Sequence, residues 1–109
     1  MEEDTQLISK KIYETNNREL SNLLIGRKGG KTTILIIDKL LSKPYNANEL
    51  SKLLNLDYKT ITHHINIIHE HKYVEKEKLE NCYLYYPSNK LFNCLDEYNL
   101  IKKFLEIKI

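Results

Sequence analysis

Two helical patterns separated by only three residues limit the possible folds of this chain more than any other feature. The first starts at Asn46, which stands three residues before Glu49 in the arrangement of a capping box. It ends at Asn55, a residue type that tolerates the left-handed conformation found after helices. Asp57 is placed to cap the second helix, so a tight helix-turn-helix is predicted for residues 46–70.

The second of these helices is predicted to be amphipathic. Ile61, Ile65 and Ile68 recur at spacings of four and three, which puts them on one side of a helix. The other side is rich in hydrogen-bonding groups, as a DNA-recognition helix requires, although an ordinary helical hairpin with a solvated face is the alternative. The candidate base- and backbone-contacting residues of this helix are Tyr58, Lys59, Thr60, Thr62, His63 and Asn66.

The regions on either side extend the prediction to a complete fold. Residues 31–43 are apolar on most sides, which indicates a central core helix that ends before Pro44. Further on, YVEKEKL and CYLYYP are two strand-like runs joined around Glu80-Asn81 as a hairpin. Three helices and then a hairpin are the order of a winged helix, and interleaved glutamates should keep the affinity of this wing for DNA modest. The predicted DNA-contacting residues of the wing are Lys76, Lys78, Asn81 and Tyr83.

Both ends of the chain lie outside this winged module. From residue 89 onward an apolar residue recurs every three or four positions, which predicts one amphipathic helix of about five turns. Pairing with the same helix of a second subunit would bury this stripe, although folding back over the core is the alternative. The N-terminal stretch should add one or two helices, with a break at Asn16-Asn17. The predicted dimerisation residues are Leu91, Leu95, Tyr98, Ile101 and Leu105.

The predicted fold is therefore mainly α with a small β-hairpin wing, an α+β winged helix-turn-helix with helical extensions at both ends. Its parts are an N-terminal extension (1–25), the winged domain (26–88) and the C-terminal helix (89–109). A length of 109 residues, 41% hydrophobic and 29% charged, suits one soluble domain with a modest core. We expect a cytoplasmic protein without a membrane span, in which Cys82 and Cys94 are reduced thiols.

Residues 26–43 carry five basic residues against a single acidic one, even though the net charge of the chain is only +2. This segment begins GRKGGKTT, which looks like the phosphate-binding loop of a nucleotide hydrolase. That loop needs a glycine five residues before Gly30, where this chain has Ile25, and it needs a preceding strand. A nucleotide-binding protein is therefore the weaker interpretation of the segment.

The helix-turn-helix and the hairpin together resemble a known family of regulators. The run LLNLDYKTITHHINIIHEHKYVEKEKLENCYLYYP resembles the ArsR-like winged helix-turn-helix regulators, whose recognition helix often reads T-V-S-H-H-L where this chain has TITHHI at residues 60–65. Tyr73-Val74 stands where the family often has G-L-V, and the segment GRKGGKTTILIIDKLLSKPYNANEL looks like archaeal members. The resemblance covers residues 26–88 and implies a regulator that binds double-stranded DNA, with the segment before the first long helix close to the DNA backbone.

On that basis the phosphates met by the basic segment are those of DNA. Arg27, Lys28 and Lys31, with the N–H groups of Gly29 and Gly30, are expected to hold phosphate oxygens. The alternative role for the two glycines is a flexible hinge before the helix.

Metal sensing and catalysis find little support in the residues. The thiolate pair that many ArsR-like repressors carry before the recognition helix has no counterpart in residues 49–53. His63 and His64 are adjacent, so their side chains should point about 100° apart on a helix and cannot easily share one ion. The sequence therefore predicts a homodimeric, sequence-specific repressor with no enzymatic activity, no cofactor and no evident effector. The alternative is a winged-helix module that binds proteins within a larger assembly.

Overall fold

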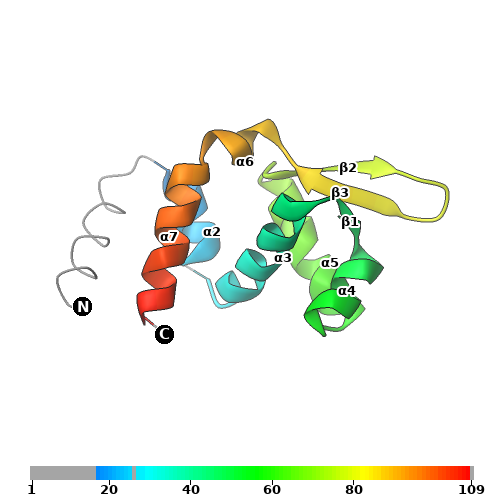
Figure 1. The fold of residues 1–109 in the computed structure, drawn as a ribbon, viewed down its shortest axis with the longest axis horizontal. Coiled ribbons are helices and arrows are strands. Elements are labelled where there is room, and N and C mark those ends of the chain that lie inside the picture. The colour runs from blue at the N-terminus through cyan, green and yellow to red at the C-terminus, as the bar shows by residue number, and fades with distance from the viewer. Residues whose placement is uncertain (1–16, 26, 109) are drawn as a thin grey trace.

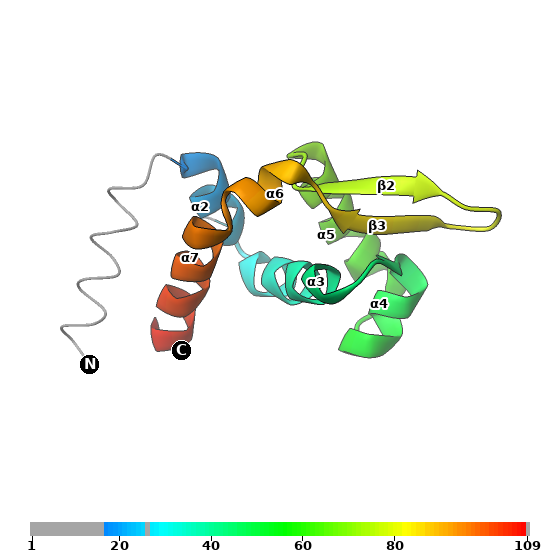
Figure 2. The same ribbon diagram turned by 45° about the horizontal axis from the view of Figure 1, so that its top comes forward.

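The computed structural model describes residues 17–25 and 27–108, so the helix predicted within residues 1–16 lies outside the described part of the chain. Figure 1 shows α2 and α7 at one end of the molecule and the hairpin of β2 and β3 at the other, with α3 and α5 between them; Figure 2 shows the same order from a second direction. In chain order the elements are α2 (Arg18–Leu24), α3 (Gly30–Ser42), β1 (Tyr45–Asn46), α4 (Ala47–Leu54), α5 (Tyr58–Glu70), β2 (Val74–Lys78), β3 (Tyr83–Pro87), α6 (Asn89–Asn93) and α7 (Leu95–Lys108).

The starts and ends of the helices around the helix-turn-helix are set by the local capping and stop signals that the sequence contains. The Glu49 N–H donates to Asn46 Oδ1 over 2.7 Å and the Asn46 N–H donates to Glu49 Oε1 over 2.9 Å, which completes the capping box of α4. Asn55 ends this helix with a φ of 54°, in the left-handed region that asparagine tolerates. Before it, α3 ends where Lys43 becomes extended ahead of Pro44. The predicted starts and ends of these helices are confirmed.

The wing belongs to a three-stranded antiparallel sheet with the order β1-β3-β2. Tyr85 in the central strand pairs with Tyr45 on one side and with Lys76 on the other. The hairpin turn is closed by a hydrogen bond of 2.8 Å from the Leu79 N–H to the Cys82 carbonyl. The hairpin is as predicted, but β1 is not, because two residues become a strand only through pairing with a distant segment.

One hydrophobic cluster joins the winged module to both extensions. Leu20, Leu23 and Leu24 of α2 are at most 2% exposed, and they share this cluster with Ile36 and Ile37 of α3. Asn17 caps α2 by accepting a hydrogen bond of 3.0 Å from the Leu20 N–H. None of the described helices has the length and apolar content that crossing a membrane requires.

The prediction of one continuous C-terminal helix is wrong. The helix is interrupted at Cys94, whose backbone (φ −120°, ψ 24°) leaves the helical region. The Cys94 N–H donates to the carbonyl of Leu91, three residues back, over 3.1 Å, and the Tyr98 N–H then donates to the Cys94 carbonyl over 2.9 Å as α7 begins. The bend lets α6 follow the end of β3 while α7 packs along α2 (Figure 1).

Candidate nucleic-acid interface

Helix α5 is held by its apolar side, which leaves its polar side open to solvent. Ile61, Ile65 and Ile68 are 0% exposed, as the spacing predicts. On the other side Tyr58 is 56% exposed, and the remaining predicted contact residues are exposed or half-buried. These remaining residues are Lys59, Thr60, Thr62, His63 and Asn66. All six predicted recognition residues therefore lie on one accessible face, which we call the recognition face.

Both threonine hydroxyls of this face are already engaged within the helix. Thr60 Oγ1 donates to Asp57 Oδ1 over 2.6 Å, and Thr62 Oγ1 donates to the Lys59 carbonyl over 3.1 Å. The hydrogen bond from Thr60 is the main cause that lowers the pKa of the Asp57 carboxyl. Asp57 precedes α5 but caps it without a side-chain bond to the backbone, because its carboxylate accepts the hydroxyl of Thr60 instead.

The segment that looks like a nucleotide loop is the start of a helix. It follows helix α2 rather than a strand, so the described structure lacks the strand-loop-helix context of a nucleotide site. Residues 27–31, here called the basic loop, carry Arg27 half-buried and Lys28 and Lys31 exposed. Arg27 Nη1 donates to Thr33 Oγ1 over 3.1 Å, and this hydroxyl donates to the Gly29 carbonyl over 3.2 Å.

The N-terminus of α3 is open to an anion. Gly29 supplies no capping side chain, and no acidic residue stands in the first turn. Within the described residues, the N–H groups of Lys31 and Thr32 meet no acceptor. The Gly30 N–H instead donates to the Arg27 carbonyl over 3.4 Å, so the expectation that it is free to bind phosphate is wrong.

Close packing accounts for the two glycines. A Cβ atom at Gly29 would overlap the Cε1 atom of His64 in α5, and one at Gly30 would overlap the backbone carbonyl of Leu24 in α2. Both φ angles lie outside the left-handed region. The glycines are therefore needed because other parts of the chain approach them, and this packing replaces the hinge interpretation.

Sequence reasoning gives no specific role to His64, which lies beneath the basic loop. Its side chain is 8% exposed, and its Nδ1 atom is buried without a hydrogen-bond partner among the described residues. Burial lowers the pKa of His64, and the nearby Arg27 and His63 lower it further. The His63 and His64 rings meet edge to face with centroids 5.3 Å apart, so the basic loop adjoins the recognition face at this point.

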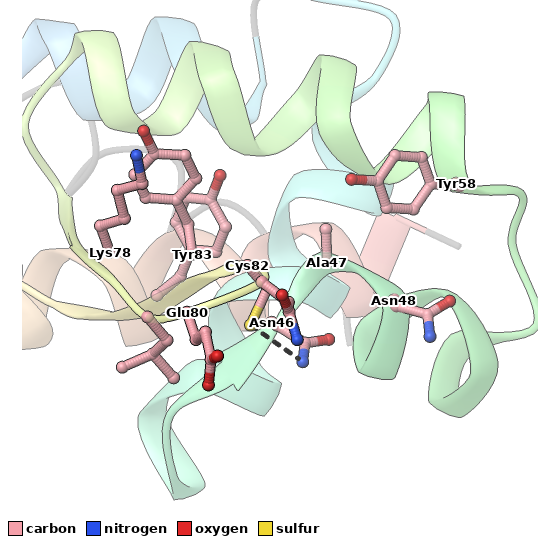
Figure 3. Close-up of a pocket in the computed structure, with 11 residues that line it drawn as sticks. Asn46, Ala47, Asn48, Tyr58, Lys78, Glu80, Cys82 and Tyr83 are labelled. Carbon is pink, nitrogen blue, oxygen red and sulfur yellow. Dashed lines mark hydrogen bonds between the residues drawn. The ribbon is translucent and has the colours of Figure 1, made fainter.

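A groove of about 610 Å³ separates the recognition helix from the wing (Figure 3). Tyr58 stands on the side of the helix, with its hydroxyl directed across the groove, and Tyr83 stands on the side of the wing. Tyr85 also lines the groove and is mostly buried, and this burial and then the neighbouring Tyr58 and Tyr83 raise its pKa. Asn46 and Asn48 line the end formed by α4, so the groove presents hydroxyl and amide groups together with the charged side chains of Lys78 and Glu80.

The predicted wing residues lie together on the hairpin. Lys76 Nζ lies 4.6 Å from the centroid of the Tyr83 ring, which fixes an exposed lysine over an aromatic face. Lys78 and Asn81 line the groove near the tip. The exposed residues of this hairpin also include Glu75, Glu77 and Glu80, which outnumber its two lysines, so the hairpin carries no net positive charge.

The predicted dimerisation stripe is divided between the core and the surface. Leu91, Tyr98 and Ile101 are 0% exposed and belong to the core cluster of their own chain. The expectation that they face a second subunit needs correction, because the bend at residue 94 folds α7 back onto α2 and α3. Leu95 and Leu105 are only half-buried.

A second groove, of about 400 Å³, lies between α3 and α7. Ile34, Leu35 and Leu105 give it an apolar lining. Next to it, the Tyr98 hydroxyl donates to Asp38 Oδ1 over 2.6 Å, and Lys102 Nζ lies 2.7 Å from Asp38 Oδ2. These polar bonds tie α7 to the central helix.

Among the described residues, no group of three or more histidine, cysteine or acidic side chains gathers as a metal site would require. Cys94 is buried, and Cys82 is half-buried. Cys82 Sγ accepts a hydrogen bond of 3.7 Å from Asn46 Nδ2.

Comparison with known proteins agrees with this architecture. Residues 30–76 match the model of the arsR family of bacterial regulatory proteins. A search of curated proteins finds no significant match.

Solved structures of regulators share the fold along nearly the whole chain. The transcriptional regulator BldR from Sulfolobus solfataricus is 16% identical, with a TM-score of 0.66 over 94% of this chain and 73% of its own. A MarR transcriptional regulator from Methanosarcina mazei is 19% identical, with a TM-score of 0.64 over 98% and 80%. The oxidised form of MarR from E. coli is 16% identical, with a TM-score of 0.62 over 94% and 74%. The chain therefore has the winged-helix fold of these solved regulators, and its residues 30–76 match the helix-turn-helix model of the arsR family.

Proposed function

We propose that the protein binds double-stranded DNA in a sequence-specific manner and represses transcription from the bound site. The observation that carries this proposal is the recognition face, which is polar and accessible on a helix anchored by three fully buried isoleucines. In the major groove, Lys59 would donate to guanine and Asn66 would pair with adenine. The methyl groups of Thr60 and Thr62 suit contact with thymine, because their hydroxyls are bonded within the helix.

Two further surfaces would hold the DNA backbone. At the basic loop, Arg27, Lys28 and Lys31 surround the uncapped start of α3, which favours a phosphate. On the other side, a helix in the major groove and a wing at the next minor groove must have one sugar-phosphate strand between them. The groove that contains Tyr58 and Tyr83 offers hydroxyl and amide donors to such a strand, as phosphate-contacting sites commonly do.

The proposed regulator acts as a homodimer. A twofold axis would place two recognition helices one DNA turn apart, as palindromic sites require. Half-buried Leu95 and Leu105, with the exposed Leu35 beside the α3–α7 groove, provide apolar surface for such contacts. Repression would follow from occupying the site that the transcription machinery needs.

Selection of bound fragments from random double-stranded DNA tests the proposal. The expected result is an enriched palindrome whose half-sites are one helical turn apart. Size-exclusion chromatography of the complex with this palindrome should give the size of a protein dimer bound to one duplex. Retention of DNA without any enriched sequence would contradict sequence recognition. No retention of DNA at all would favour a winged-helix module that binds proteins.

A further inference from the structure

His64 is a buried polar group for which the proposed DNA contacts give no use. It lies on the recognition helix, yet the residue is only 8% exposed and its Nδ1 atom has no partner among the described residues. Burying a nitrogen without a hydrogen bond costs free energy that an apolar side chain would avoid. A histidine in this place therefore needs a reason other than core stability.

The ring is in direct contact with the basic loop. A Cβ atom at Gly29 would overlap His64 Cε1 and would stand 3.1 Å from Nδ1 and 3.2 Å from Nε2. Only glycine lets the loop come this close to α5. The Gly29 carbonyl accepts the hydroxyl of Thr33, and this hydroxyl accepts a hydrogen bond from Arg27, so the position of the guanidinium is linked to the ring of His64.

We propose that His64 is the positioning residue of the basic loop: by filling the hollow at Gly29 it fixes Arg27 and Lys28 beside the recognition face, so that phosphate and base contacts are made in one register. This inference rests on the proposed DNA-binding function and adds to it a residue that touches no DNA. It also gives a physical reason for the glycine of a segment that superficially looks like a nucleotide-binding loop.

The surroundings of His64 favour the neutral form of its ring. The charged or titratable groups that act on it are Arg27 from the loop and His63 from its own helix. Both oppose a positive charge at His64, and so does burial. Release of the loop would return the pKa of the His64 ring to near its ordinary value of 6.5. Because the released state then binds a proton more readily, lowering the pH through 6.5 favours release and weakens the phosphate contacts.

The test measures the loop and the DNA contacts separately. His64→Ala empties the hollow, and Gly29→Ala blocks it, whereas His69→Ala removes a histidine of the same helix away from the loop. In both loop variants, amide hydrogen exchange at residues 27–32 should become faster. The slope of log affinity against log salt, measured on a random-sequence duplex, should fall by about 0.9 for each phosphate that the loop no longer neutralises. The His69→Ala control should match the wild type in both measurements.

A third variant separates filling of the hollow from protonation of the ring. His64→Leu occupies the hollow without titrating. At pH values above 6.5 it should therefore have the salt slope of the wild type, and it should lack the change in slope that is expected of the wild type at lower pH. Its folding is expected even where His64→Ala is unstable. Folded loop variants with the exchange and the slope of the wild type would overturn the positioning role alone. A wild-type protein that binds no duplex would overturn the proposed function as well.

Discussion

At the scale of single residues, the chemistry of the recognition face follows from which side of α5 is buried. Lys59 and Asn66 are exposed side chains with donors that can form hydrogen bonds to base edges, whereas Lys28 and Lys31 carry charges beside a helix start. The first pair suits base reading and the second suits sequence-independent attraction to phosphate. The two pairs should therefore behave differently when they are replaced.

Replacing Lys59 and Asn66 together by alanine should weaken binding to the selected site by about 1–3 kcal/mol for each base that is no longer read, with little change for random DNA. Replacing Lys28 and Lys31 should weaken both DNAs alike and reduce the salt slope by about 0.9 per phosphate. Titrations of both duplexes at several salt concentrations give the comparison. Identical behaviour of the two double variants would refute the assigned roles.

Ile65 offers a residue-scale test of the anchor beneath that face. It is 0% exposed in the core cluster, so Ile65→Ala should lower the free energy of unfolding by about 2–5 kcal/mol, because less apolar surface is buried and a cavity remains. Asn66→Ala, the next residue but on the exposed side, is the matched control and should change stability little. Urea denaturation followed by circular dichroism measures both. Equal decreases in the two variants would mean that α5 is oriented differently.

At the scale of elements, local signals predict what local forces decide. The capping box at Asn46, the left-handed Asn55 and the stop before Pro44 all act within a few residues, and the structure has each of them. Strand β1 exists only because Tyr45 pairs with Tyr85, which lies far along the chain. The helix break at Cys94 has no glycine or proline beside it, so the sequence does not predict it. Pattern reasoning misses features that depend on distant partners.

The capping box gives a prediction for α4. Asn46→Ala removes the acceptor of the Glu49 N–H and should lower the free energy of unfolding by about 0.5–2 kcal/mol. Asn48→Ala changes an exposed asparagine inside the same helix and should have a smaller effect. Thermal unfolding of the two variants under one condition decides the point, and a larger decrease for Asn48→Ala would speak against the cap.

At the scale of the whole molecule, polar bonds and one shared core join the extensions to the winged module. The Glu19 carboxylate of α2 accepts from Lys90 Nζ over 2.6 Å and lies 2.9 Å from His71 Nδ1 at the end of α5. Tyr73 also donates to it over 3.2 Å. The contact between His64 and Gly29 is likewise long-range, so the sequence revealed the recognition face but could not reveal how the basic loop is held against it.

The Glu19 cluster predicts a response of stability to acid. Hydrogen bonds from Lys90 and then His71 lower the pKa of Glu19 from 4.5 to about 2. Because the folded pKa is the lower one, the stabilisation is complete above pH 4.5 and is lost as the pH falls from 4.5 towards 2. Glu19→Gln should therefore lose less stability across this window than the wild type does, whereas Glu75→Gln on the wing should follow the wild type. Urea denaturation at several pH values would show it, and parallel curves for Glu19→Gln and wild type would rule the linkage out.

The pairing of β1 with β3 has a mechanical consequence. The stem of the wing and the entry to α4 are parts of one sheet, with Asn46 serving both as a strand residue and as the cap of the helix. The hairpin is thus connected through β1 directly to the first turn of the helix-turn-helix. In the proposed complex, a bent or widened duplex that displaced the hairpin tip would therefore also act on the helix-turn-helix, which couples the response to DNA shape with the reading of base sequence.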